Sequence, residues 1–572
     1  MLHRIKRFFK RGDYRSNRDI APDEIFLDSK NLPDFDDSQF EGRIEKPIPH
    51  AVFGVMIFFI LFLGAIFVYK IWDLQVVQGQ TFRIRSDNNS LHKTVVFADR
   101  GVIYDRNNIP LAWNNINPKT TDFSLRVYAT STGLSTVLGY IKYPTKDSNG
   151  FYYQDSYDPK DGIEKIYDNQ ISGKNGTKII ETDVKGNVVS ESVIDPPLDG
   201  NNLELSIDVA LQKELNTSLL DLAQRAGFKG GAGVIMDIHT GEIIASSNFP
   251  EYDSGTMTDG SDNNRISGWL TSKSYPFLNR VVDGLYTPGS IMKIFIAMGV
   301  LDQGVISPTK QILSTGSITI PNPYFPDKPS TFLDWKAHGL VDLRHALAVS
   351  SNVYFYEVTG GYQEQKGIGI YNIEKYTRMF GFGTTTGVYF PGENSGTIPS
   401  PEWKSANFNG EAWRVGDTYN TAIGQYGFQV SPLQVVRAVA AIANEGTLLT
   451  PTFLKAKTDG DNNETKKTGT ITLDPNFYTI VKEGMRLCVT AGTCQAINLP
   501  FVEIASKTGT AQLGVTKDEV NSWVIGFWPY KNPKYAFAIV MEKGSRTNQF
   551  GATLVMQEFF SWMNIYAQEY LK

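Results

Sequence analysis

The chain has 572 residues, of which 41% are hydrophobic and 20% charged, so it can bury a sizeable core and is not expected to be generally disordered. Its 55 basic and 60 acidic residues leave a formal net charge of −5, which argues against a nucleic-acid binder. Two cysteines exclude a disulfide-rich scaffold, and the sequence contains no zinc-finger spacing, phosphate-binding loop or GxSxG nucleophile elbow.

An uncharged apolar run at residues 51–69 predicts a membrane-spanning helix, with 51–70 as the expected span. Helical residues rise 1.5 Å each, so the run matches the ~30 Å thickness of the hydrocarbon core of a bilayer. Residues 1–18 carry seven basic residues and one acidic residue, which predicts that residues 1–50 form a cytoplasmic tail. The protein would then be a single-pass protein of the cytoplasmic (inner) membrane, with its catalytic part outside the cytoplasm.

Cys488 and Cys494 would therefore lie in a compartment that permits disulfides. Two free thiols fit the sequence nearly as well, because the geometry of a pair cannot be read from spacing alone.

Residues 71–225 mix short strand-like runs with turns rich in glycine and asparagine, and end in a helix predicted over 209–226. No chemically reactive side chains are concentrated there. We interpret this region as a mixed, β-rich pedestal between the membrane span and a larger domain.

The remaining residues, 226–572, begin with two apolar strands around Thr240-Gly241, which indicate a hairpin over 231–249. Helix-like and strand-like stretches then follow in this order: helices over 289–303, 342–358 and 431–444, strands over 521–530 and 535–544, and an amphipathic helix over 551–571. Strands at both ends with helices between them predict an α+β domain whose sheet joins the two ends.

The sharpest chemical pattern is Ser290-Ile291-Met292-Lys293, which follows a Pro-Gly break and opens an apolar helix. Serine and lysine at i and i+3 share one helical face, so the lysine could hydrogen-bond the hydroxyl and accept its proton if burial lowers the lysine pKa. The pattern alone is weak, because residues 307–310 (Ser-Pro-Thr-Lys) also fit it.

Two further triplets are informative only in context. Ser-x-Asn occurs several times, including Ser350-Ser351-Asn352, and Lys-Thr-Gly occurs at both Lys467 and Lys507. Lys467 lies in a charged, Asn-rich stretch that reads as a loop, whereas Lys507 follows an apolar run that predicts an edge strand. A strand can preorganise a lysine and backbone N–H groups, so Lys507 is the better candidate. For any single triplet a solvated turn is the more common explanation.

In order, Ser290–Lys293, Ser350–Asn352 and Lys507–Gly509 form the motif set of serine β-lactamases and penicillin-binding proteins. From about Trp72 to the C-terminus the chain resembles a class B penicillin-binding protein. The stretches that carry the resemblance include RGVIYDRNNIPLA (100–112), GAGVIMDIHTGEIIA (231–245), NRVVDGLYTPGSIMK (279–293), LDWKAHGL (333–340), GTIPSPEWK (396–404) and AIGQYGFQVSPLQVVRAVAAIANEG (422–446). Several of them are similar to the elongation type, penicillin-binding protein 2, more than to the division type.

The resemblance implies a transpeptidase domain with an antiparallel sheet and helices, standing on an elongated pedestal. The implied boundaries are a tail (1–50), a span (51–70), a pedestal (71–225) and the transpeptidase domain (226–572). Three departures bear on loops: Asn108 and Ser506 replace glycines, and Tyr426-Gly427 inverts the frequent order.

Some relatives of the elongation type hold zinc near the middle motif, and Asp334 and His338 resemble two of its ligands. The other two positions would be Thr315 and Ser351, which are poor zinc ligands. We therefore expect no metal and no cofactor, and a hydrogen-bonded Asp334–His338 pair instead.

The resemblance also implies the chemistry: D,D-transpeptidation of peptidoglycan stem peptides through a serine acyl-enzyme that β-lactams also form. Ser290 would be the nucleophile, Lys293 its base, Ser350 a proton relay and Asn352 a ligand of the substrate amide. Lys507, Thr508, Gly509 and Thr510 would form the carboxylate-binding strand, with the N–H groups of Ser290 and Thr510 as the oxyanion hole.

Other readings stay open. The alternative enzymes are a D,D-carboxypeptidase or β-lactamase, which uses water as acceptor, and a division-type (septal) transpeptidase. The alternative that is not an enzyme is a non-catalytic β-lactam sensor or scaffold. The expected partners are stem peptides, β-lactams, the membrane and a SEDS-type glycosyltransferase docked on the pedestal and span, with a passive spacer as the alternative role of the pedestal. No nucleic acid is expected.

Overall fold

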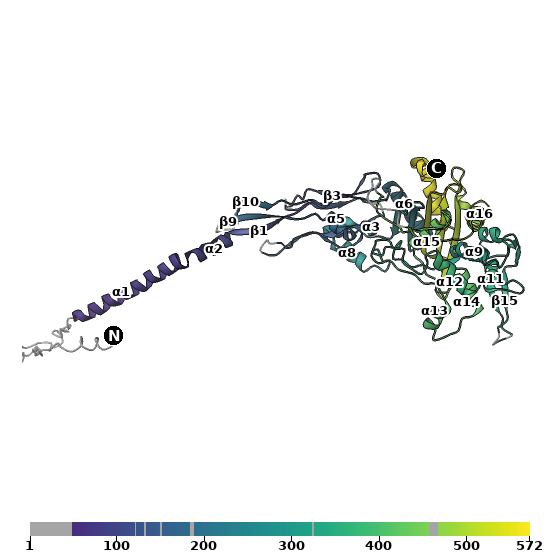
Figure 1. Cartoon of the computed structure of the whole chain (residues 1–572), viewed down its shortest axis with the longest axis horizontal. Coiled ribbons are helices and arrows are strands. Elements are labelled where there is room, and N and C mark those ends of the chain that lie inside the picture. The colour runs from purple at the N-terminus through teal and green to yellow at the C-terminus, as the bar shows by residue number, and fades with distance from the viewer. Residues whose placement is uncertain are drawn as a thin grey trace, which may run out of the picture. The chain divides into compact units, whose positions relative to one another are not determined.

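The computed structural model describes residues 49–119, 122–130, 133–148, 152–182, 188–322, 325, 327–456 and 467–572, without the side chains of 85–92 and 467. The chain divides into two compact units, Met1–Asn89 and Ser90–Lys572. Figure 1 labels their elements.

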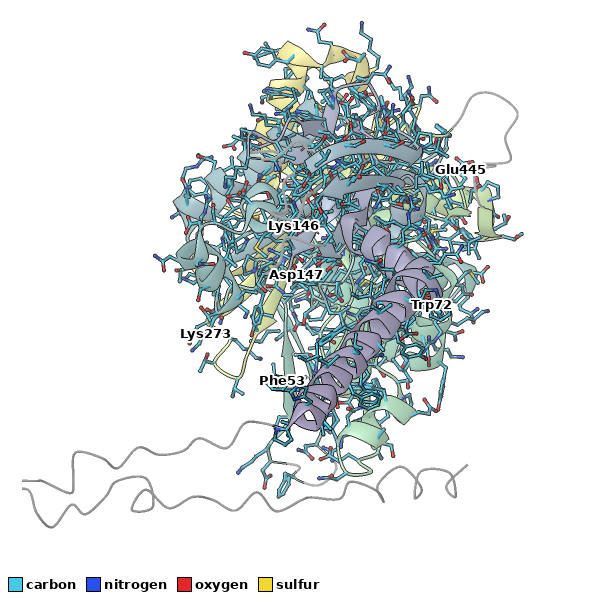
Figure 2. All side chains as sticks on the ribbon, turned by 90° about the vertical axis from the view of Figure 1, so that its left-hand side faces the viewer. Phe53, Trp72, Lys146, Asp147, Lys273 and Glu445 are labelled. Atoms are coloured by element: carbon cyan, nitrogen blue, oxygen red, sulfur yellow. A yellow bond between two sulfur atoms is a disulfide. The ribbon has the colours of Figure 1, made fainter. Side chains whose placement is uncertain are left out.

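The described part of the first unit is helical. Helix α1 (His50–Trp72) continues into the π-helix η5 (Asp73–Val77), and α2 (Gly79–Ser90) follows. None of the residues of α1 is buried, and Figure 2 labels Phe53 and Trp72 near its two ends. From His50 to Val77 the helix is long and apolar enough to cross a membrane. The predicted span 51–70 lies within α1.

The second unit begins with small sheets. One has the strand order β1 (Leu91–Val96), β9 (Gly176–Thr182), β10 (Val188–Asp195), and another β11 (Leu203–Glu204), β2 (Ile103–Tyr104), β3 (Pro110–Asn115), β4 (Leu125–Tyr128). Two short pairs and three short helices complete this region: β5 (Ile141–Lys142) with β8 (Asp158–Pro159), β6 (Thr145–Lys146) with β7 (Tyr152–Gln154), and α3 (Ser135–Leu138), α4 (Gly162–Ile166) and α5 (Asp168–Ile171). Its many short strands agree with the β-rich character expected from the sequence.

A five-stranded antiparallel sheet organises the rest, in the order β13 (Ile243–Phe249), β12 (Gly230–Asp237), β22 (Tyr535–Ser545), β21 (Glu519–Trp528), β20 (Ala505–Leu513). Strand β12 pairs with β22, so the two ends of the segment meet at the centre of the sheet. The predicted α+β domain, with its 231–249 hairpin and its sheet joining both ends, is confirmed.

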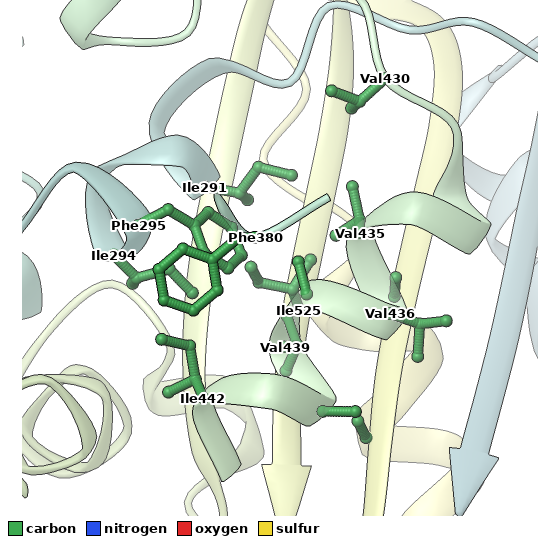
Figure 3. Packing of buried hydrophobic residues seen from close by; sticks show 14 of the residues in the cluster. Ile291, Ile294, Phe295, Phe380, Val430, Val435, Val436, Val439, Ile442 and Ile525 are labelled. Carbon is green, nitrogen blue, oxygen red and sulfur yellow. The ribbon is translucent and has the colours of Figure 1, made fainter. Parts of the chain in front are cut away.

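Both faces of this sheet are covered. Successive residues of a strand point to opposite faces, so neighbouring residues of β21 belong to different hydrophobic clusters. Trp523 and Ile525 belong to one hydrophobic cluster, with the helices α9 (Lys293–Asp302) and α15 (Pro432–Ala443). Val524 belongs to the other, with α6 (Val209–Ala226) and α17 (Thr553–Tyr566). Figure 3 shows part of the first cluster and labels Phe295, Val439 and Ile525 in it.

The remaining elements surround this core. The helices are α7 (Ser254–Asp259), α8 (Asn263–Leu270), η6 (Gly289–Met292), α10 (Leu343–Ala348), α11 (Asn352–Gly360), α12 (Ile370–Met379), α13 (Pro401–Asn407), α14 (Val415–Ala422), α16 (Pro475–Ala491), η7 (Gln495–Ile497) and η8 (Gln568–Leu571). The strand pairs are β14 (Ile312–Ser314) with β17 (Gly339–Val341), β15 (Ser317–Ile320) with β16 (Ser330–Leu333), and β18 (Thr447–Leu449) with β19 (Lys467–Thr470).

Candidate active site

Ser290 lies in a tight turn that is held from two sides. It is the second residue of the 3₁₀ helix η6, directly before α9. Gly289 has φ +61° and donates its N–H to the carbonyl of Gly424 at 2.9 Å. The indole of Trp523 on β21 donates to the carbonyl of Thr287 at 3.0 Å. The helix start predicted from the Pro-Gly break therefore exists, and it is fixed by the sheet and by a neighbouring loop.

Lys293 is the residue on which the motifs converge. It is fully buried, and its Nζ donates to the Ser350 carbonyl at 2.9 Å, the Asn352 Oδ1 at 2.7 Å and the Ser350 Oγ at 3.4 Å. Among the hydrogen bonds of the described residues, none joins Lys293 Nζ to Ser290 Oγ, although the sequence predicted that contact. The i, i+3 spacing places both residues on one face of a 3₁₀ turn, but the amine is drawn to the Ser350–Asn352 turn.

Burial also sets the charge of this amine. It lowers the pKa of Lys293 to about 7, and the negative charge of Asp334 offsets only part of the effect. A neutral amine has two N–H donors, which can serve the Ser350 carbonyl and Asn352. Its lone pair then remains available to take a proton from a hydroxyl, which is what a base for Ser290 or Ser350 requires.

The Ser350–Asn352 motif forms a sharp turn between α10 and α11. Ser350 has φ +58°, in the left-handed region that a residue with a Cβ rarely adopts. Ser351 caps α11, because its hydroxyl accepts from the Tyr354 N–H. The helix-like stretch predicted over 342–358 is therefore two helices, α10 and α11, with the motif between them. The apolar periodicity persists on both sides of the break, which hid the capping serine.

Asp334 holds this turn in place through hydrogen bonds. Its Oδ2 accepts from the Ser351 hydroxyl at 2.8 Å, the Val353 N–H at 3.0 Å and the Ser314 hydroxyl at 3.2 Å. Burial alone would raise the pKa of Asp334. The backbone N–H groups of Asn352 and Val353, together with the charge of Lys293 and the Ser351 hydroxyl, outweigh burial and hold the pKa below its usual value. Asp334 is thus a structural carboxylate beneath the middle motif, a role that the sequence alone did not suggest.

Asp334 and His338 are neighbours, as expected from the sequence, but the contact between them is long. His338 Nε2 lies 3.6 Å from Asp334 Oδ1, beyond hydrogen-bond distance, and this buried nitrogen has no hydrogen-bond partner among the described residues. Ser351 donates to Asp334, and the Thr315 hydroxyl donates to the Ser317 carbonyl at 3.1 Å. Over the described ranges, no three His, Cys, Asp or Glu side chains gather in a way that could hold a metal.

Strand β20 carries Lys507 and forms the edge of the five-stranded sheet, as predicted. Lys507 is fully buried, and its Nζ donates to the carbonyl of Thr508 at 2.8 Å. Burial, and after it the neighbouring charge of Lys293, lower the pKa of Lys507 well below its ordinary value. Among the described strands, β21 alone pairs with β20, so the outer row of backbone groups of β20 can receive an extended ligand.

Gly509 lets the nucleophile turn approach this strand. A Cβ at Gly509 would lie 2.8 Å from the Pro288 carbonyl oxygen and 2.9 Å from Ile291 Cγ2, both too close. On the other side, a Cβ at Gly289 would lie 3.1 Å from the carbonyl oxygen of Thr510. The backbones of the Ser290 turn and of Thr510 are therefore neighbours, as the predicted oxyanion hole requires.

Each departure from the family pattern has a structural counterpart. Asn108 and Tyr426 adopt φ +61° and +62°, in the left-handed region that glycine would favour. The buried Ser506 hydroxyl donates to the carbonyl of Ile525 at 2.7 Å, so it is satisfied within the sheet.

Two further segments fit the sequence motifs but lie outside this site, and we call them decoy motifs: the Lys-Thr-Gly triplet at Lys467 and residues 307–310. Lys467 begins strand β19, which pairs with β18, so its assignment to a loop is wrong. Its charged neighbours masked a short strand that forms through pairing with β18, which precedes it in the sequence. At 307–310 the Ser307 hydroxyl meets that of Thr309, and Lys310 donates to Gln365. No contact joins that serine and lysine among the described hydrogen bonds.

The two cysteines form a disulfide. Cys488, near the end of α16, is joined to Cys494, directly before η7, with 5.2 Å between their Cα atoms. Of the two states that the sequence left open, the structure has the bonded one.

Comparisons with known proteins agree with this geometry. Residues 231–560, more than half of the chain, match the family model for the penicillin binding protein transpeptidase domain, and 116–205 match that for the penicillin-binding protein dimerisation domain. The peptidoglycan D,D-transpeptidase MrdA of Acinetobacter baumannii is 32% identical over 71% of this chain and 60% of its own. That of Salmonella typhimurium is 28% identical over 84% of this chain and 90% of its own.

Solved structures give the same result. The chain resembles Pseudomonas aeruginosa PBP2 in complex with WCK 5153, with a TM-score of 0.66, 28% identity, and coverage of 82% of this chain and 97% of that one. It also resembles PBP2 of Helicobacter pylori in its complex with MreC, with a TM-score of 0.66, 26% identity, and coverage of 83% and 98%. The chain belongs to the penicillin-binding protein transpeptidase family.

Proposed function

We propose that the protein is a peptidoglycan D,D-transpeptidase of the elongation type. The observation that carries the proposal is the convergence of Ser350, Asn352 and a fully buried Lys293 beside the Ser290 turn, against an edge strand that carries a second buried lysine, Lys507. The relatives named peptidoglycan D,D-transpeptidase MrdA support the substrate class.

In the acylation step, Ser290 Oγ attacks the carbonyl carbon of the penultimate D-alanine while Lys293 takes its proton. The N–H groups of Ser290 and Thr510 stabilise the oxyanion. The C–N bond then breaks, and Ser350 passes a proton to the departing D-alanine amine. In the second step the amine of another stem peptide attacks the ester, forms the cross-link and returns the proton to Ser290 through the same groups.

The other residues bind the donor peptide. Asn352 holds its amide, and Lys507, Thr508 and Thr510 bind its terminal carboxylate on the outer edge of β20, with Gly509 admitting the close approach. A β-lactam acylates Ser290 by the same attack. No cofactor is required, because the peptide bond that breaks supplies the energy of the one that forms.

Adduct mapping tests this assignment. After reaction with penicillin, the added mass should lie on the peptide that contains Ser290, and Ser290→Ala should abolish labelling. Ser307→Ala, at the decoy motif, should label like the wild type. Labelling that persists in Ser290→Ala would refute the assignment.

Product analysis with stem peptides separates the remaining enzyme classes. A transpeptidase yields cross-linked dimers when an acceptor amine is present, whereas a carboxypeptidase releases D-alanine without dimers. A protein that binds penicillin reversibly, without a covalent adduct, would be a sensor or scaffold.

The proposal includes the membrane arrangement. Residues 1–50 lie in the cytoplasm, 51–70 span the membrane, 71–225 form the pedestal and 226–572 the transpeptidase domain outside the cytoplasm. The apolar helix α1 and the basic residues of 1–18 support this orientation.

We further propose that the pedestal and span dock a SEDS-type glycosyltransferase. All residues of strand β10 are exposed, and Val189 and Val193 expose 65% and 57% of their surface. Such apolar residues on an exposed strand suit a protein partner. The relative from Helicobacter pylori was solved in a complex with another protein, MreC.

The test compares a double change in the pedestal with a single control change in the catalytic part. Val189→Ser with Val193→Ser should reduce co-purification with the glycosyltransferase and glycan polymerisation, while penicillin labelling stays normal. Val515→Ser, at a 99% exposed valine of the catalytic part, should change neither. If folded pedestal variants keep full binding and polymerisation, the pedestal is a passive spacer.

A further inference from the structure

A short covalent loop links the two substrate-binding motifs. The disulfide between Cys488 and Cys494 closes it, and Thr493 lies directly before the second cysteine. Both cysteines are fully buried, whereas Thr493 is partly buried. The loop is tightened further by the N–H groups of Gly492 and Cys494, which both donate to the carbonyl of Cys488.

Thr493 touches both motifs from this loop. Its hydroxyl lies 2.5 Å from the hydroxyl of Thr508 on β20, and its N–H donates to the carbonyl of Ala348 at 3.1 Å. Ala348 ends α10, two residues before Ser350. The neighbouring Gly492 is packed as closely, because a Cβ there would lie 2.1 Å from the Ala348 carbonyl oxygen.

The direction of the hydroxyl pair follows from the chemistry of its neighbours. Thr493 Oγ1 lies 3.3 Å from Cys488 Sγ, and a disulfide sulfur carries no proton to donate. The Thr508 oxygen is a better acceptor than the disulfide sulfur, which favours Thr493 as the donor of this pair. The Thr508 proton is then free to point away from Thr493, and a hydroxyl that accepts one hydrogen bond donates a stronger one.

We propose that Thr493 is a positioning residue for Thr508, and that the Cys488–Cys494 disulfide holds it in place. Thr493 orients the Thr508 hydroxyl as a donor toward the terminal carboxylate of the substrate. The inference rests on the proposed function, in which Thr508 binds that carboxylate. It adds a residue and a covalent link outside the three sequence motifs.

The test uses two acylating probes that differ only at the carboxylate, benzylpenicillin and its methyl ester. Thr493→Val keeps the shape of the side chain and removes the hydroxyl. Its second-order acylation rate with benzylpenicillin should fall about five- to tenfold, the effect of losing one hydrogen bond in a charged-ligand site. The rate with the ester should change little, so the acid-to-ester rate ratio falls.

Three further variants complete the experiment. Thr493→Ser restores the hydroxyl and should restore the ratio. Thr508→Val should lower the ratio, and adding Thr493→Val to it should lower it little further, because both act through one interaction. Cys488→Ser with Cys494→Ser should lower the ratio as Thr493→Val does. Should the cysteine variant fail to fold, the threonine variants still decide the role of Thr493.

The possible results distinguish a failure of this inference from a failure of the proposed function. An equal loss with both probes in Thr493→Val would show a merely structural residue and overturn the inference, as would an unchanged ratio. A wild-type protein that takes up neither probe would overturn the proposed function itself and this inference with it.

Discussion

The pedestal and the active site both bury charged side chains, but they compensate them differently. In the pedestal, Glu164 accepts from Arg100 Nε at 2.5 Å and from Arg126 Nε at 2.7 Å, and all three side chains are buried. In the active site, Lys293 and Lys507 are fully buried, and neither forms an ion pair with a carboxylate among the described residues.

The pKa values follow this difference. Burial alone would raise the pKa of Glu164, yet the two arginines hold it below its ordinary value, so the cluster stays ionised. Burial lowers the pKa of Lys293 to about 7, so its amine can exchange a proton near neutral pH. A compensated buried charge serves the fold, whereas an uncompensated one serves reactivity. Four measurements test this contrast.

The largest effect on acylation is expected for Lys293→Met, which keeps the bulk of the chain and removes the amine. The penicillin acylation rate should fall by about three orders of magnitude, as for loss of a general base. The thermal midpoint should change little, because removing a buried amine is favourable but leaves the Ser350 carbonyl and Asn352 Oδ1 without their donor. Lys310→Met, at the decoy motif, is the control and should leave labelling intact. Fast acylation in Lys293→Met would remove the base from the mechanism.

The second effect distinguishes the two Lys-Thr-Gly triplets. Lys507→Ala should slow acylation by about two orders of magnitude, because it removes a preorganised amine from the carboxylate site. Lys467→Ala should change little, since β19 pairs with β18 in a sheet separate from that of β20. The acylation rates of the two variants are measured in parallel with fluorescent penicillin. If both substitutions slow acylation equally, the edge strand β20 is not the strand that binds the substrate.

The third measurement is the pH profile of acylation. The neutral amine of Lys293 is the reactive form, so the rate should rise about tenfold per pH unit below 7 and level off above. The pKa of Lys293 is about 7 in the folded state and 10.5 in the unfolded state. Between these pH values the unfolded chain therefore binds more protons than the folded chain. Titration of Lys293 thus makes the free energy of unfolding rise with pH from about 7 to 10.5. A flat rate profile from pH 5 to 8 would contradict this assignment.

The smallest effect on acylation is expected in the pedestal. Glu164→Gln leaves two buried arginines uncompensated and should lower the free energy of unfolding by about 3–5 kcal/mol. Acylation per folded molecule should not change. Glu191→Gln removes an exposed ion pair with Lys178 and should cost at most about 1 kcal/mol. Chemical denaturation combined with active-site titration separates the two quantities. A slower acylation in folded Glu164→Gln would tie the pedestal to catalysis.

Much of the architecture was readable because it depends on local signals. The helix predicted over 209–226 has those bounds as α6, since Asp208 caps its first N–H groups and Gly227 ends it with φ +68°. The alternating strands near both ends of the large domain were equally clear. Motif order and context pointed to Ser290, Lys293, Ser350, Asn352 and Lys507, which the structure brings to one region.

The rest depends on contacts between distant segments. The turn at Ser350 needs the anchor at Asp334, and β19 forms only by pairing with β18. The partners of Lys293 lie near residue 350, 57 and 59 positions away, so spacing alone favoured Ser290. The pairing of Cys488 with Cys494, and the contact of Thr493 with Thr508, likewise require the folded chain.

The pairing of β12 with β22 has a consequence for how the protein is made. Gly230 and Glu542 are partners, so the central ladder of the sheet joins segments that are synthesised far apart in time. Until Tyr535–Ser545 has emerged, the earlier hairpin of β12 and β13 has no neighbour on its second side, and β20 and β21 cannot join it. Such long-range pairing is slow and leaves apolar edges open to aggregation. The five-stranded sheet, and with it the edge strand that carries Lys507, therefore cannot be complete in a growing chain until Tyr535–Ser545 has been made.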